Sequence, residues 1–228
     1  MKYFKIDGTP IESMSAYCDL THEDLSGKDL CNGDFRNRTF RKTNFSECNL
    51  EGANFKNATL IDCNFELAFL INSNFEDAIA KSCEFIDIMA VDVNFKYGDF
   101  EGSSFYGSDL QSADFCFSNL KDCSFAKSNV IKANFQNTCL LDSCFYDARF
   151  FDTNFNFSEF MNLCDFVKYE MDRKKIFNIL INNGCIINDV NNKKGEWKRK
   201  LGEYGDERYL SLFSLPQIEF HFRNMFKK

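Results

Sequence analysis

The chain has 228 residues, of which 44% are hydrophobic and 27% are charged, and its formal net charge at pH 7 is −7. No apolar run is long enough to cross a bilayer, and residues 1–10 lack the apolar core of a signal peptide. These features exclude a membrane protein and lead us to expect a cytoplasmic one. The length suits one domain with a capping segment at each end.

The first predicted element is a cap over residues 1–17. Residues 3–6 (Tyr-Phe-Lys-Ile) predict a short strand, and Asp7-Gly8 predicts a turn after it. A stack of coils exposes unpaired backbone and apolar side chains at its first coil, so a cover of this kind is needed there.

A repeat of five residues follows and dominates the chain. The positions on one phase from Leu20 to Phe160 number 29, and they hold 17 Phe and 9 Leu. The residue two places earlier is small (Ala, Cys, Ser, Thr or Gly) at 24 of these 29 units. Residues two apart face the same side of an extended backbone, so both point inward. This period fits neither a helix nor a flat strand, and it predicts a coil that turns a corner in every unit.

The complete unit is a small residue, Asn or Asp, Leu or Phe, and then two polar residues, as in Ala53–Asn57 and Ser108–Ser112. This unit resembles that of the pentapeptide-repeat family, and the resemblance covers Cys18 to about Phe160. It implies a mainly β fold, a right-handed quadrilateral parallel β-helix with four units in each coil. Residues twenty apart should then stack, and the column from Phe35 to Phe155 is Phe throughout. We therefore expect a solenoid of about seven coils over residues 18–165.

One coil departs from the pattern. Ala80 and Ala90 stand where Phe or Leu is the rule, while Ile88 and Val93 are large for inward positions that are otherwise small. An exchange of volume within the core explains all four residues, because cores tolerate such swaps. A local bulge is the alternative.

Cysteine usage and missing motifs argue against a metal, a cofactor and catalysis. Five of the 11 cysteines fill the small inward position, which predicts buried reduced thiols. These are Cys18, Cys48, Cys63, Cys83 and Cys123. No CxxC pair is present, and His22 and His221 are far apart in sequence. No nucleophile elbow or phosphate-binding glycine loop occurs, so we expect a protein that is not an enzyme.

The repeat phase ends after Phe160, and residues 166–190 predict a helix at 172–182 followed by an apolar strand at 185–187. Asp172 can cap the helix, and Asn183-Gly184 can end it. This order is similar to the C-terminal segment of gyrase-protecting pentapeptide-repeat proteins, where the segment joins two subunits. The resemblance implies a homodimer, and a cap on a monomer is the alternative. The apolar residues of this segment are Ile176, Phe177, Leu180, Ile181, Ile186 and Ile187. Residues 191–228 predict a basic loop and a small tail with strands at 209–213 and 217–222.

Charge is divided unevenly along the chain. Residues 43–165 carry 19 acidic and 7 basic side chains, whereas residues 166–228 carry 8 acidic and 13 basic ones. An acidic rod attracts the basic surfaces that bind DNA, so we expect a DNA mimic that binds a type II topoisomerase such as DNA gyrase or topoisomerase IV. The β-helix itself should not bind nucleic acid. The acidic residues expected to contact the partner are Asp62, Glu84, Asp87, Asp99, Asp109, Asp114, Asp122, Asp142 and Asp147. Solubility of a β-rich rod is the simpler explanation of these charges.

An alternative function is that of a protein-interaction scaffold. Outward positions should be polar, yet Phe69, Ile71, Met89 and Val91 are not. Stacking of residues twenty apart places Phe69 beside Met89 and Ile71 beside Val91, so the four predict one exposed apolar patch. Local repacking around Ala90 that buries some of them is the alternative.

Overall fold

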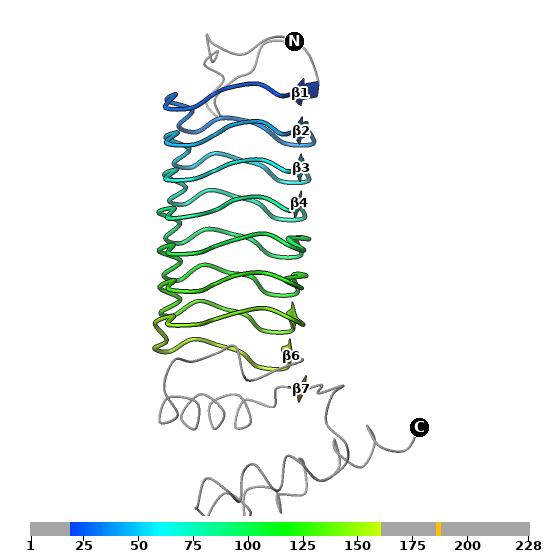
Figure 1. The fold of residues 1–228 in the computed structure, drawn as a ribbon, viewed down its shortest axis with the longest axis vertical. Coiled ribbons are helices and arrows are strands. Elements are labelled where there is room, and N and C mark those ends of the chain that lie inside the picture. Colours follow the sequence, from blue (N-terminus) through cyan, green and yellow to red (C-terminus); the bar gives the residue numbers. More distant parts are fainter. Residues whose placement is uncertain (1–18, 161–185, 188–228) are drawn as a thin grey trace, which may run out of the picture. The chain divides into compact units, whose positions relative to one another are not determined.

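The computed structural model describes residues 19–160 and 186–187 (Figure 1). The predicted N-terminal cap, the helix at 172–182 and the tail at 191–228 lie outside the described residues.

Short parallel strands stack along one side of the described coil. Strands β1 (Asp19–Thr21), β2 (Thr39–Arg41), β3 (Thr59–Ile61) and β4 (Ile79–Lys81) form one sheet in chain order. Each residue pairs with the one twenty places further on, as Phe40 does with Leu60. The other three sides are joined by single parallel bridges with the same offset. The predicted right-handed, four-sided parallel β-helix is therefore confirmed.

The corners are made by the second residue after each large apolar residue. Non-glycine residues at these corners have φ between 52° and 63°, a left-handed conformation. Asn, Asp and Gly adopt it at the lowest cost, which explains why the repeat favours them there.

The core is built from two adjacent columns of stacked Phe rings. In one column, Phe35 and Phe55 stack with centroids 4.7 Å apart, and the stacking continues to Phe155. Rings of the neighbouring column meet them edge to face, as Phe65 does with Phe55 at 5.9 Å and 81°. Such pairs add to the hydrophobic stabilisation that burial provides.

The irregular coil has no bulge. Ala80, Ala90, Ile88 and Val93 are all buried, and the bridges continue on both sides of them. The exchange of volume instead loosens one ring stack of the core. The ring centroids of Phe75 and Phe95 are 5.3 Å apart, and the ring planes are tilted by 32°.

A second sheet ends the described coil. Strands β5 (Cys139–Leu140), β6 (Glu159–Phe160) and β7 (Ile186–Ile187) are parallel and lie in that order. The strand predicted at Ile186 and Ile187 is present as β7. It pairs with Glu159 and Phe160 of β6 and so adds a third strand to this sheet. The other four residues of the expected dimer segment, Ile176, Phe177, Leu180 and Ile181, lie outside the described residues.

Nothing in residues 19–160 or 186–187 forms a helix that is long and apolar enough to cross a membrane.

Candidate functional site

Where the residue before a large apolar residue is Asn or Asp, it belongs to a polar ladder that runs along the coil. Its side-chain oxygen accepts a hydrogen bond from the backbone two residues later, as Asp114 does from Cys116 N at 3.0 Å. At five places where an Asp is followed by Asn twenty residues on, the Asn amide donates to the Asp carboxylate. Three expected partner-binding residues, Asp99, Asp109 and Asp114, therefore also hold neighbouring coils together.

We name two halves of the coil by their charges. The paired half comprises residues 53–62, 73–82, 93–102 and 113–122, two consecutive sides of each coil. The acidic half comprises residues 43–52, 63–72, 83–92 and 103–112, the other two sides.

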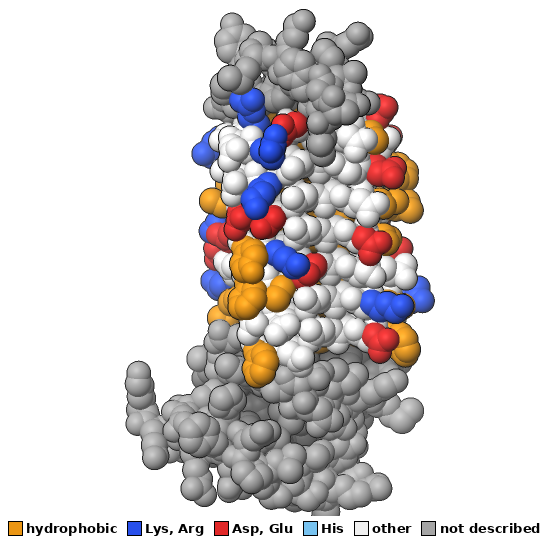
Figure 2. Space-filling view, turned by 180° about the vertical axis from the view of Figure 1, so that it is seen from behind, with side chains coloured by type: hydrophobic (Ala, Val, Ile, Leu, Met, Phe, Trp, Pro, Cys, Tyr) orange, Lys and Arg blue, Asp and Glu red, His pale blue; other side chains and the backbone are white. Residues whose placement is uncertain are grey.

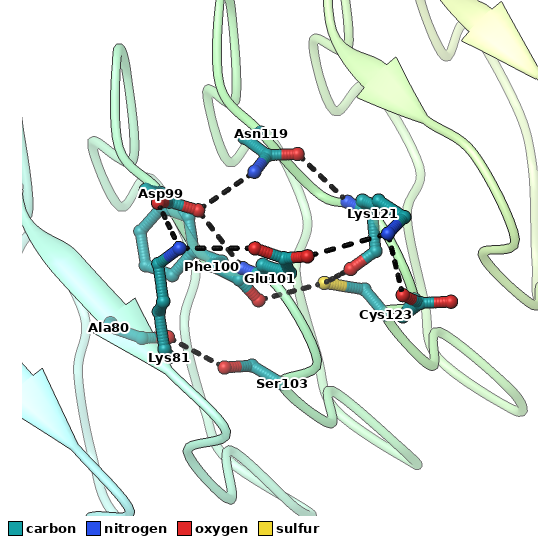
Figure 3. Close-up of polar contacts among 10 residues, drawn as sticks. Ala80, Lys81, Asp99, Phe100, Glu101, Ser103, Asn119, Lys121 and Cys123 are labelled. Atoms are coloured by element: carbon teal, nitrogen blue, oxygen red, sulfur yellow. Dashed lines mark hydrogen bonds and ion pairs between the residues drawn. The ribbon is translucent and has the colours of Figure 1, made fainter.

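The paired half carries ladders of ion pairs. Lys81 Nζ lies 2.8 Å from Asp99 and 3.0 Å from Glu101, and Lys121 lies 3.5 Å from Glu101 (Figure 3). Hydrogen bonds to Asp99 and then to Glu101 raise the pKa of Lys81. The hydrogen bond from Lys81 likewise lowers the pKa of Glu101. These carboxylates are thus neutralised by neighbours on their own surface.

The remaining lysines of the paired half are also bound. Lys56 contacts Glu76 at 3.0 Å, and Lys96 contacts Asp114 at 2.9 Å. Figure 2 shows one side of the rod, on which basic and acidic side chains lie next to each other with hydrophobic ones between them. The surface seen there is mixed rather than uniformly acidic.

The acidic half is different because it contains no Lys or Arg and seven acidic residues. None of the seven takes part in an ion pair within the described coil. Six are exposed and Asp109 is half-buried. They are Glu47, Glu51, Glu66, Glu84, Asp87, Asp92 and Asp109.

The expected acidic residues are thus spread over both halves. Glu84, Asp87 and Asp109 lie in the acidic half. Asp62, Asp122 and Asp142 share one corner column outside it, with Lys121 3.4 Å from Asp122. Asp147 lies in the same corner column as Asp87, one coil after Lys127. Lys127 Nζ lies 5.2 Å from the centre of the Tyr106 ring. Lys127 marks the end of the stretch without basic residues.

An apolar patch lies within the acidic half. Phe69 and Met89 are bridged neighbours in successive coils, with 46% and 43% of each residue exposed. Ile71 and Val91 stack beside them but are half-buried. The structure adds Leu67, which is 48% exposed at a corner with φ 59°. Leu67, Phe69, Ile71, Met89 and Val91 are called the apolar patch below.

A second apolar feature lies on a corner of the paired half. Tyr97 and Phe117 are about half exposed and stack with centroids 5.5 Å apart. The sequence analysis missed this stack and Leu67. The signal that identifies them is a large apolar residue at the corner position, where the repeat most often places Asn, Asp or Gly.

Cys48 and Cys123 are buried thiols with a packing role. The Cys48 thiol donates to Leu25 O at 2.9 Å, and the Cys123 thiol donates to Phe100 O at 3.0 Å. Burial raises the pKa of both thiols, that of Cys48 to about 11. Within the described coil, no three His, Cys, Asp or Glu side chains gather in a metal-binding arrangement.

Solved structures similar to this one are repeat proteins of low sequence identity. HetL, a pentapeptide-repeat protein involved in heterocyst differentiation regulation in the cyanobacterium Nostoc sp. strain PCC 7120, is 15% identical, with 75% of this chain and 83% of HetL covered and a TM-score of 0.46. A trypsin-treated form of QnrB1, a plasmid-mediated fluoroquinolone resistance protein, is 18% identical, with 82% and 95% covered and a TM-score of 0.43. A pentapeptide-repeat protein of the Arabidopsis thaliana thylakoid lumen is 20% identical, with 74% and 84% covered and a TM-score of 0.17.

A comparison with curated protein sequences gave no significant match. Two family models do match the chain. The model of the pentapeptide repeat region matches residues 58–135, and the model of pentapeptide repeats in eight copies matches residues 16–52. Together they span just over half of the chain, and the period, the register and the stacked core agree with them. The chain belongs to the pentapeptide-repeat family.

Proposed function

We propose that this protein is a non-catalytic binding protein of the cytoplasm that presents its acidic half to a basic protein surface, as DNA does. The partner proposed is a type II topoisomerase, DNA gyrase or topoisomerase IV. The observation that carries the proposal is that seven acidic residues on the acidic half have no Lys or Arg among them. On the paired half, by contrast, every lysine holds a carboxylate.

The physical basis is the field of unpaired charges on a rigid support. Successive coils are spaced by about 4.8 Å, so about seven of them make a rod on the order of 35 Å long. Carboxylates fixed along such a rod attract a basic DNA-binding saddle and repel DNA itself. The β-helix is therefore proposed to bind a DNA-binding protein and no nucleic acid.

A second candidate function is that of a scaffold that binds a protein through the apolar patch. The exposure of Phe69 and Met89 at neighbouring positions favours it. Binding of this kind should tolerate salt, because hydrophobic contacts are not screened. Topoisomerase binding driven by charge should weaken steeply as salt rises.

We also propose a homodimer joined through residues 166–190. Among the described residues, β7 (Ile186–Ile187) is the last strand of its sheet and pairs with β6. A strand edge is a ready surface for a second chain. Sedimentation equilibrium should give twice the chain mass of 26.5 kDa. A mass of one chain at micromolar concentration would contradict the dimer and leave β7 as a cap.

The test of the proposed function is the supercoiling activity of DNA gyrase with increasing amounts of the purified full chain. Dose-dependent inhibition that weakens from low to moderate salt is expected. Topoisomerase IV decatenation is measured in parallel. The absence of an effect on both enzymes at micromolar protein contradicts the proposal.

A further inference from the structure

The apolar patch and the unpaired carboxylates lie on the same half of the coil. Glu47 and Glu51 come one coil before Leu67 and Ile71 in the twenty-residue register, and Asp87 comes one coil after Leu67. We propose that this surface is the docking site for a basic amphipathic segment of a partner protein. Apolar side chains of the segment cover the patch, and its Lys and Arg side chains face the carboxylates. This inference rests on the proposed function and names the face used and the chemistry of the partner.

The fold does not require Phe69 and Met89 to be apolar. In the same column, Asn49 donates to Asp29 at 3.1 Å, and Asn129 donates to Asp109 at 3.1 Å. Asn at positions 69 and 89 would continue this ladder and leave less apolar surface in water. Phe69 and Met89 instead interrupt the polar ladder and expose nearly half of each residue. The exposed apolar surface therefore indicates a contact with another molecule.

Leu67 supports the same conclusion from its backbone. Its φ of 59° is a conformation that Gly, Asn and Asp adopt more easily than Leu. It is also 48% exposed, so it adds to the apolar surface of the patch. Most corners of the coil carry Asn, Asp or Gly, so the exposed Leu adds apolar surface beside Phe69 at a position where the fold does not need it.

The charges around the patch select the kind of partner. Six exposed carboxylates without a Lys or Arg among them favour a segment that carries Lys or Arg. The same charges repel a second copy of this face, which excludes self-association through it. They also repel the phosphates of nucleic acid. The patch is narrow, because its three most exposed residues, Leu67, Phe69 and Met89, come from only two neighbouring coils, so it fits a short segment better than a broad apolar interface.

Binding of the full chain to a synthetic helical peptide tests the inference. The probe is a fluorescent amphipathic helix with Leu on one face and Lys on the other, and its affinity is measured by anisotropy. An oligolysine of equal charge is the control for attraction without an apolar anchor. The wild-type protein should bind the Leu–Lys helix at least about tenfold more tightly than oligolysine. Equal affinities would show that the patch contributes nothing and would overturn the inference.

Variants of the apolar patch test whether the Leu–Lys helix binds on the acidic half. Phe69→Asn with Met89→Asn copies the residue that the column has at Asn49 and Asn129, and it should weaken binding of the Leu–Lys helix by about tenfold or more. The matched control is Ile79→Thr, because Ile79 is 43% exposed on the paired half and its column contains Thr59. This control should bind within about twofold of wild type. Equal loss in both proteins, or no loss in either, would overturn the inference.

The Leu67→Asn variant provides a second test of the docking site in case the variant with both Phe69→Asn and Met89→Asn does not fold. Asn suits the left-handed corner, so Tm should rise while affinity for the Leu–Lys helix falls severalfold. Unchanged affinity in a stabilised Leu67→Asn protein would count against the docking site.

The gyrase assay separates this inference from the proposed function. If wild type does not inhibit gyrase but peptide binding depends on Phe69 and Met89, the topoisomerase proposal fails alone. If the double variant loses peptide binding and still inhibits gyrase, the docking site stands and gyrase binds elsewhere. If gyrase is inhibited and peptide binding ignores every patch variant, the docking site fails alone.

Discussion

The amide of Asn134 donates a 3.0 Å hydrogen bond to the carboxylate of Asp114, twenty residues and one coil earlier. The same relationship joins Asn119 to Asp99 and Asn129 to Asp109. Each pair aligns an amide with a carboxylate and avoids two like charges directly opposite each other, which would destabilise the sheet. A step from Asp to Asn between neighbouring coils therefore favours their register and avoids adding a second surface charge at that position.

Asn134→Asp should disturb this ladder in a pH-dependent way. The substitution replaces the donated hydrogen bond by repulsion between two carboxylates, so the free energy of unfolding at pH 7 should fall by about 1–3 kcal/mol. Protonation near pH 4 lets one carboxyl donate to the other, so part of the loss should be recovered. Urea denaturation at both pH values measures this.

The matched control is Asn137→Asp, which adds the same charge at a corner whose column already contains Asp77. It should change stability by less than about 0.5 kcal/mol. Equal effects of the two variants at both pH values would show that the ladder contributes no register energy.

The exchange of volume in the irregular coil predicts coupling between Ala80 and Phe100. Phe100 follows Ala80 in one column, and its ring lies 5.2 Å from that of Phe95 and 6.3 Å from that of Phe85. Ala80→Leu alone should overfill the core and cost about 1–3 kcal/mol. Phe100→Leu alone should lose buried surface, and the double variant should be more stable than the sum of the two effects by about 0.5–3 kcal/mol. Strictly additive energies from thermal or urea denaturation would contradict the exchange.

Burial of Cys48 predicts a loss of stability in alkali. Burial raises the thiol pKa from 9.0 to about 11 in the folded protein. The unfolded thiol loses its proton first as pH rises, so this contribution is complete below pH 9 and is lost as pH rises toward 11. The free energy of unfolding of the Cys48→Ala variant should therefore fall less steeply over this pH interval than that of wild type. Its free energy of unfolding at pH 8 should be lower than that of wild type. An identical pH dependence of the two proteins would contradict the assigned burial effect.

The period of five predicted a coil that turns a corner in every unit, because each unit has an inward pair of residues. The resemblance to the pentapeptide-repeat family implied its right hand and its four sides. The column of Phe from Phe35 to Phe155 also predicted the stacking of coils. What the period could not supply is the pairing of surface charges. Lys81 and Asp99 belong to different coils, and their contact depends on side-chain reach rather than on sequence spacing. The division into an acidic half and a paired half became evident only once these ion pairs were known.

Corner residues were also underestimated in the sequence. Leu67, Tyr97 and Phe117 stand at positions that the sequence analysis regarded as polar turns, and the exposed fractions of the residues mark them as unusual. Of the six residues expected to form the dimer segment, the structure describes only Ile186 and Ile187, which pair with β6 as strand β7. The other four lie outside the described residues.

The measurement that tests the central claim most directly compares two charge reversals of equal size in the gyrase supercoiling assay. Asp87→Lys with Asp92→Lys changes the acidic half, at corners whose columns already contain Lys127 and Lys132. Asp62→Lys with Asp142→Lys makes the same change in net charge at a corner outside it, in a column that already contains Lys42. The account predicts that the first pair abolishes inhibition at low salt while the second pair retains most of it. Equal inhibition by the two variants would contradict the claim that the acidic half is the binding face.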